Sequence, residues 1–182
     1  NTDGKNDMRR FVGMAALALM LGGCGAAAGG IAPGALGVSA RDAYVEARSV
    51  ARSWAPESEL RWVEGEDIGT DGIALPESGV WTFHYTAPGE TRDLRVRVTP
   101  LETMSEERPV TGPPGYILGD NVLDTSWIDS RRVMAGVEQA AASAPDAPVS
   151  VLLVPTRPHQ WIVEIDGTRW RVHAETGEVL ER

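Results

Sequence analysis

The pattern of hydrophobic residues occurs twice along the chain, and this internal repeat constrains the fold more than any other feature. Each copy begins with helical periodicity and continues with three short runs in which apolar and polar residues alternate, as in half-buried strands. The first copy begins at Ser39 and the second at Ser126. The repeated order of one helix and three strands predicts an α+β fold of two tandem units, in which antiparallel sheet packs on helices.

Both predicted helices begin with a capping-box pattern. Ser39 and Ser126 are each followed three residues later by an aspartate. The hydroxyl can accept early backbone amides, and the carboxylate is favoured by the helix dipole. Proline ends each helical pattern, at Pro56 and Pro145. The predicted buried stripes consist of Tyr44, Ala47, Ala51 and Trp54 in the first copy and of Val133, Val137, Ala140 and Ala144 in the second.

The predicted strands follow each helix. They cover residues 60–64, 80–86 and 94–98 in the first copy, and 149–154, 161–165 and 169–173 in the second. Asp166-Gly167 separates the last two runs by two residues, which predicts a type I′ hairpin. This turn places Trp161, Val163, Trp170 and Val172 on one face, which we expect to pack against a helix. The acidic segment 64–71 lacks the spacing of a calcium loop and is predicted to be a solvated loop.

The segment from Met8 to Cys24 has the order of a bacterial signal peptide. Two arginines precede an apolar run over residues 11–21, and small residues follow it. The run is too short for a membrane-spanning helix, which needs roughly 20 residues. Its end, Leu21-Gly22-Gly23-Cys24, resembles the bacterial lipobox, in which a signal peptidase cuts before a cysteine that carries diacylglycerol. The resemblance implies lipidation of Cys24; the alternative is a short buried helix with an incidental cysteine.

These patterns divide the chain into four parts. Residues 1–23 are the predicted signal peptide, of which 1–7 precede Met8 and resemble an upstream extension. Residues 24–38 are the lipidated cysteine and a flexible Gly/Ala-rich tether, and the two repeat units span 39–115 and 116–182. A lipid anchor at Cys24 implies a protein of the bacterial cell envelope. Gly25 is not the aspartate that retains some lipoproteins at the inner membrane, so we expect the outer membrane, facing the periplasm.

The second copy resembles the PepSY and PepSY-like family. The resemblance rests on Trp161-Ile-Val-Glu-Ile, on the turn Asp166-Gly167, and on a closing segment Val172-His-Ala-Glu-Thr-Gly-Glu-Val-Leu. The first copy shares only Gly79-Val-Trp81 and the paired strands, and Ala174 stands where the family more often has aspartate. The resemblance implies a domain that binds or inhibits a protein partner, for example a peptidase, and it brings no catalytic residue. Thr176-Gly177 is expected to form a tight turn with glycine at positive φ.

Composition and motifs exclude several classes of function. The formal net charge is −9, which argues against a broad surface that binds nucleic acid. Cys24 is the only cysteine, so the chain can form neither an internal disulfide nor a thiolate zinc site. His84, His159 and His173 stand in no metal-spaced motif, and no GxSxG sequence is present. We therefore predict no catalytic residue, metal or cofactor.

The outward-facing positions of the predicted strands carry the candidate partner face. It consists of Arg95, Arg97, Arg169, Arg171, His84 and His173. If the two sheets join, the arginines would form a basic stripe suited to bidentate contacts with carboxylates of a partner protein. The alternative is cross-strand pairing with residues such as Glu164. Trp62 and Trp127 have no clear core position and are candidate partner anchors.

The sequence thus predicts a non-enzymatic, lipid-anchored envelope protein that binds another protein through an open sheet face. The family resemblance implies a peptidase as one such partner. Two alternatives stay open. The first is a structural or assembly-factor lipoprotein of the outer membrane, and the second is an accessory protein or enzyme of unrecognised class.

Overall fold

The computed structural model describes residues 37–109, 122–141 and 149–182. The predicted signal peptide, Cys24 and most of the tether lie outside these ranges, as does the predicted boundary at 115/116. The first half contains α1 (Ala40–Trp54), β1 (Glu59–Ile68), β2 (Val80–Thr86), β3 (Arg92–Val98) and β4 (Thr103–Pro109). The second half contains α2 (Ser130–Ala141), β5 (Val149–Val154), β6 (Gln160–Ile165), β7 (Thr168–His173) and β8 (Val179–Glu181).

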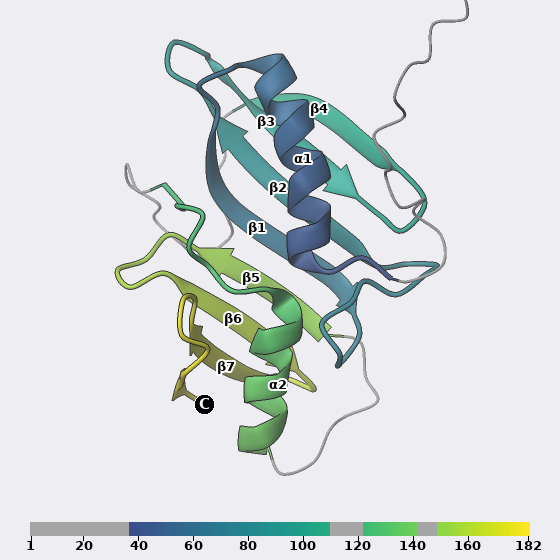
Figure 1. Cartoon of the computed structure of the whole chain (residues 1–182), viewed down its shortest axis with the longest axis vertical. Coiled ribbons are helices and arrows are strands. Elements are labelled where there is room, and N and C mark those ends of the chain that lie inside the picture. Colours follow the sequence, from purple (N-terminus) through teal and green to yellow (C-terminus); the bar gives the residue numbers. More distant parts are fainter. Residues whose placement is uncertain (1–36, 110–121, 142–148) are drawn as a thin grey trace, which may run out of the picture. The chain divides into compact units, whose positions relative to one another are not determined.

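The eight strands form one antiparallel sheet with the order β4-β3-β2-β1-β5-β6-β7-β8 (Figure 1). Each half is a meander, and the two meanders join where β1 pairs with β5. The predicted α+β class is therefore confirmed, and so is antiparallel sheet packed on helices. The expectation of three strands per unit is wrong, because β4 and β8 add a fourth strand to each half. Neither showed the expected alternation, since β4 is exposed along its whole length and β8 has three residues.

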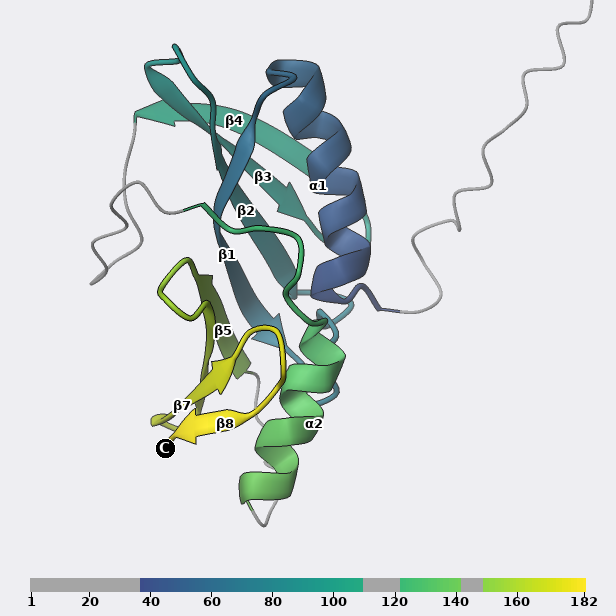
Figure 2. The same ribbon diagram turned by 60° about the vertical axis from the view of Figure 1, so that its left-hand side comes forward.

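Both helices lie on the same side of the sheet (Figure 2). α1 covers β2 and β3, and α2 covers β7 and β8. The side chains beneath the helices form one hydrophobic core that runs through both halves. The other side of the sheet, which we call the open face, carries no helix of the described residues.

The first helix begins as predicted. Ser39 is its N-cap and accepts the amide of Asp42, whose carboxylate accepts from the Ser39 amide in return. Tyr44, Ala47 and Ala51 are buried against the sheet. The local pattern at this position was sufficient because both capping partners lie within one turn of the helix.

The second helix begins three residues later than the capping-box pattern predicted. The amide and hydroxyl of Ser126 both donate to the carboxylate of Asp124, at 2.8 and 2.5 Å, so Ser126 stabilises a turn before the helix. The helix starts at Ser130. The first-turn amides of Arg132 and Val133 donate to the Asp129 carbonyl.

The buried stripe of α2 also differs in part from the prediction. Val133 and Val137 are buried as expected, but Ala140 is exposed, and Met134 is buried in addition. Ala144 lies outside the described residues. The core contacts of α2 therefore come from its first two turns.

Side chains at the start of α2 cap the start of α1. The Ala40 amide donates to Ser130 Oγ at 3.0 Å, and the Arg41 amide donates to Asp129 Oδ1 at 3.0 Å. The Ser130 hydroxyl donates in turn to the Gly72 carbonyl at 2.7 Å. Amides that a helix start leaves without partners are thus satisfied by side chains of the other half. This junction ties α1, α2 and the loop after β1 together.

The hairpin between β6 and β7 has the predicted register. Val163 pairs with Trp170, and the remaining five pairs follow in sequence from Gln160 to Ile165. Asp166 and Gly167 have φ of 48° and 73°, as a type I′ turn requires. Gly177 has φ of 81° in the turn before β8, which confirms the tight turn at Thr176-Gly177.

Candidate functional site

The site is built on the open face, where one row of paired residues crosses all eight strands. Glu64 lies near the middle of this row, between Thr82 on β2 and Leu152 on β5. The full row consists of Met104, Arg97, Thr82, Glu64, Leu152, Ile162, Arg171 and Glu181. Because side chains alternate between the two faces along a strand, all members of the row point away from the helices.

Strand β1 carries more of the open face than the sequence predicted. It extends to Ile68, so the first half of the acidic segment 64–71, expected to be a solvated loop, belongs to a strand. The pairing with β2 shifts between Leu60 and Trp62, which marks a β-bulge at Arg61. The extra residue turns both Trp62 and Glu64 toward the open face while Leu60 and Val63 stay in the core.

Trp62, Glu64 and His84 form a packed cluster on this face. The His84 ring stacks on the Trp62 indole, with centroids 4.0 Å apart and planes inclined by 12°. Trp62 Nε1 donates to Glu64 Oε1 at 3.1 Å, and His84 Nε2 lies 3.4 Å from Glu64 Oε2. Trp62 is only 3% exposed. Each carboxylate oxygen therefore has a partner, and the cluster is held in one arrangement.

Two opposing effects act on the pKa of the Glu64 carboxyl. Burial disfavours the charged form and would raise the pKa. The hydrogen bond and charge of His84 act against it, as do the Trp62 hydrogen bond and the charge of Arg95. The net result is a lowered pKa, so Glu64 is ionised at neutral pH and stabilises the fold at pH values above its ordinary pKa. This contribution is lost as the pH falls through the lowered pKa.

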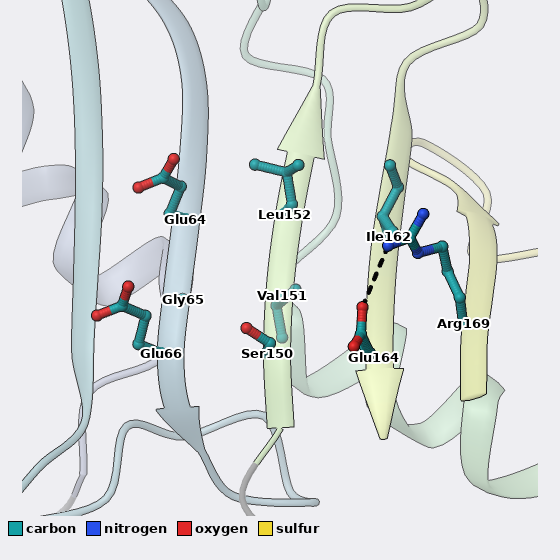
Figure 3. A pocket seen from close by; sticks show the side chains of 9 residues that line it. All are labelled: Glu64, Gly65, Glu66, Ser150, Val151, Leu152, Ile162, Glu164 and Arg169. Carbon is teal, nitrogen blue, oxygen red and sulfur yellow. Dashed lines mark hydrogen bonds and ion pairs between the residues drawn. The ribbon is translucent and has the colours of Figure 1, made fainter. Parts of the chain in front are cut away.

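A shallow hollow of about 220 Å³ lies beside this cluster, across β1, β5, β6 and β7 (Figure 3). Its carboxylates come from Glu64, Glu66 and Glu164, and Arg169 reaches from β7 to Glu164 at 3.3 Å. Leu152 and Ile162 contribute aliphatic surface. The hollow thus combines acidic groups with apolar side chains.

The structure places the four predicted arginines on the open face but does not bring them together. Arg95 and Arg97 lie on β3, and Arg169 and Arg171 lie on β7, with four strands between them. At about 4.8 Å per strand, Arg97 and Arg171 are roughly 24 Å apart. The two sheets are joined as expected, and the joining strands are β1 and β5. Because these strands lie between β3 and β7, the arginines are separated and do not form one basic stripe.

Three of the four arginines have acidic partners on neighbouring strands. Arg95 lies 3.3 Å from Glu106, Arg169 lies 3.3 Å from Glu164, and Arg171 lies 2.6 Å from Glu181. The cross-strand pairing that the sequence left open is therefore present. Such half-exposed pairs contribute at most about 1 kcal/mol each, so they leave the side chains available to a partner.

The histidines of the predicted face have structural contacts. His84 belongs to the Trp62 cluster, and His173 Nδ1 accepts the amides of Glu175 and Thr176 in the turn before β8. His159 Nδ1 donates to the Thr156 carbonyl at 2.9 Å, and its Nε2 lies 3.7 Å from Asp124. Hydrogen bonds from Ser126, together with the charges of His159 and Arg41, lower the pKa of Asp124.

The two candidate tryptophan anchors are buried. Trp127 is 1% exposed and belongs to the core, where it makes edge contacts with Tyr44 and Trp161, so its assignment as an anchor is wrong. Trp62 lies on the open face, but His84 covers its ring. Spacing alone could not place Trp62, because the β-bulge at Arg61 shifts the alternation by one residue.

Two further properties follow from the described residues. No group of three histidine, cysteine, aspartate or glutamate side chains within them is arranged to hold a metal ion. None of their helices has the length and apolar character needed to cross a membrane.

Comparisons with known proteins give a likeness of fold. No protein-family model matches the sequence, and no curated protein matches it significantly, so the PepSY resemblance stays a prediction. A solved structure of a "putative lipoprotein" from Clostridium difficile resembles the chain with a TM-score of 0.52 and 12% identity. The match covers 81% of this chain and 93% of that one. At this identity the likeness shows a common fold and nothing finer.

Proposed function

We propose that this chain is a lipid-anchored protein of the bacterial cell envelope that binds another protein with its open face and catalyses no reaction itself. The observation that carries the proposal is the placement of both helices on one side of the sheet (Figure 2). The other side presents charged and aliphatic side chains across eight strands. A face of this kind, without a covering element among the described residues, is typical of an interaction surface.

The shape of the open face favours a protein partner over a small molecule. Pockets for small molecules are usually concave, largely apolar and about 300–1,000 Å³ in volume. The hollow beside Glu64 is smaller, at about 220 Å³, and is shallow and acidic. The salt bridge between Glu164 and Arg169 is exposed, so either side chain can pair with a charged group of another protein instead. The PepSY resemblance of the second half points to a peptidase as the partner.

The sequence around Cys24 carries the proposal of a lipid anchor. The sequence Leu21-Gly22-Gly23-Cys24 follows an apolar run with a basic flank, as in a lipobox. The solved structure with a similar fold is described as that of a "putative lipoprotein", and at 12% identity this likeness bears on the fold alone. A diacylated or triacylated cysteine anchors a protein stably, which a single acyl chain does not. With Gly25 after the cysteine, we assign the anchor to the outer membrane, with the folded part in the periplasm.

The anchor is tested by Cys24→Ala. We expect an uncleaved and unlipidated precursor, because the thiol is the group that carries the lipid and its modification precedes cleavage in this pathway. Metabolic labelling with a fatty-acid analogue should mark the original protein and not the variant, and the variant should be heavier by the signal peptide. Label that persists in the Cys24→Ala protein would refute the assignment.

The binding face is tested by the double variant Arg169→Ser with Arg171→Ser. We expect little change in the free energy of unfolding, because both ion pairs are exposed and contribute at most about 1 kcal/mol each. The amount of partner recovered with the protein from detergent-solubilised envelope should fall several-fold. Arg48→Ser with Arg52→Ser is the matched control, since it removes the same charge from the exposed side of α1. Equal losses from both double variants would argue against the open face.

A further inference from the structure

The two edges of the sheet differ in a way that points to a second copy of the chain. One edge is β8, which has three residues and offers little backbone for pairing. The other edge is β4, which has seven residues, all of them exposed. Met104 and the neighbouring Leu101 are 40% and 75% exposed and are two of the four large hydrophobic side chains exposed in the described residues. An edge of this length is a template for strand pairing.

The turn before β4 shows which backbone groups of the strand point outward. The Thr99 amide donates to the Glu102 carbonyl at 2.9 Å, so this pair is of the hydrogen-bonded kind. Hydrogen-bonded and non-bonded pairs alternate along an antiparallel ladder. The pairs of Met104 and Glu106 with β3 are therefore hydrogen-bonded as well, and the backbone amides and carbonyls of these two residues point toward β3. The groups that face away from the sheet belong to Thr103, Ser105 and Glu107.

We propose that β4 pairs antiparallel with β4 of a second copy, with Ser105 opposite Ser105 at a two-fold axis. In this register Thr103 of each copy lies opposite Glu107 of the other, so all three outward-facing residues exchange backbone hydrogen bonds. The Glu107 carbonyl also accepts from Arg92 at 3.0 Å, and its second lone pair serves the new strand. Pro109, which has no amide to donate, falls opposite Leu101, beyond the paired segment.

The side chains of β4 are complementary to themselves in this register. Glu102 lies opposite Arg108, and Met104 lies opposite Glu106, each pair occurring twice. Shifting the centre to Glu106 places two glutamates face to face. Shifting it to Met104 places Glu102 opposite Glu106. Like charges directly opposite each other destabilise a strand pair, so only the register centred on Ser105 avoids them among these three.

The geometry of the pairing limits the assembly to a dimer. A two-fold axis between identical strands uses the same edge of both molecules, so no second β4 edge stays free. The short β8 edge then ends the sheet on both sides, which opposes open-ended growth. The helices of both copies lie on one side, and the two open faces become one continuous surface.

The test is a cysteine cross-link in the full chain. Paired Cα atoms of a hydrogen-bonded pair are about 5.5 Å apart, which suits a disulfide. Ser105→Cys should therefore give, on mild oxidation in the envelope, a band at twice the mass of the single chain. Thr103→Cys is the matched control, since its two copies would be about 14 Å apart. It should form a disulfide only when mixed with Glu107→Cys protein.

Swapping the charges of two paired residues distinguishes a dimer in the proposed register from cross-links formed by random collision. Arg108→Glu should reduce the Ser105→Cys dimer at least about tenfold, and adding Glu102→Arg should restore it. Both positions are exposed, and circular dichroism checks that the variants fold. The proposal is overturned if Ser105→Cys gives no more dimer than Thr103→Cys, if the exchange does not restore the dimer, or if the cross-link captures another protein in place of the second copy. Loss of partner binding would leave this result unchanged.

Discussion

Trp161→Ala is expected to lower the free energy of unfolding by about 3 to 5 kcal/mol, because truncation of a large buried aromatic side chain leaves a cavity. Trp161 is fully buried at the point where the two halves meet. Its ring makes edge contacts with Trp81 of β2, at 6.4 Å between centroids, and with Trp127 before α2, at 5.7 Å. The loss is comparable with the whole stability of a marginal domain, so we expect little folded protein at 37 °C.

Trp161→Phe is the control for this prediction. The indole Nε1 is buried and has no hydrogen-bond partner among the described residues, so phenylalanine removes a polar group that nothing satisfies. It also retains most of the ring, and it should cost clearly less than alanine. Urea unfolding followed by circular dichroism at one pH measures both. If the alanine and phenylalanine variants lose the same free energy of unfolding, packing of the ring at this position is not what joins the halves.

The same measurement tests the open face. If the double variant at Arg169 and Arg171 unfolds as early as Trp161→Ala, these arginines serve the stability of the fold and not the binding of a partner.

The parts of the fold that could be predicted from the sequence depend on neighbours in the chain. The β6–β7 hairpin is set by a two-residue turn, so every pair in it followed from Asp166-Gly167. The α1 capping box joins residues three apart and was predicted for the same reason. The edge strand β4 was missed because an exposed strand carries no alternating apolar pattern.

The candidate site depends on long-range pairing, which the sequence does not specify. Arg95 and Arg97 were correctly assigned to one side of a strand, since alternation along a strand is local. Their separation from Arg169 and Arg171 follows from the β1–β5 junction, which no local pattern encodes. The contact between Glu64 and His84 spans 20 residues and requires the bulge at Arg61, so the acidic segment looked like a loop.

Ser130→Ala, at the start of α2, is expected to lower the free energy of unfolding by the second large amount. The Ser130 hydroxyl is fully buried and holds two backbone groups that lie far away in the sequence. It accepts the Ala40 amide, 90 residues away, and donates to the Gly72 carbonyl, 58 residues away. Alanine removes the hydroxyl and leaves both groups buried without a partner. Because each unsatisfied group costs about 1–3 kcal/mol, we expect a loss of about 2 to 6 kcal/mol.

Ser126→Ala tests the same prediction from the opposite side. The Ser126 hydroxyl is exposed and donates only to Asp124, so its removal should cost less than about 1 kcal/mol. The capping-box pattern in the sequence would reverse this order, since it places the helix start at Ser126. Urea unfolding of the two serine variants under identical conditions therefore distinguishes the two helix starts. A larger loss from Ser126→Ala than from Ser130→Ala would mean that α2 begins where the local pattern placed it and that Ser130 does not cap the start of α1.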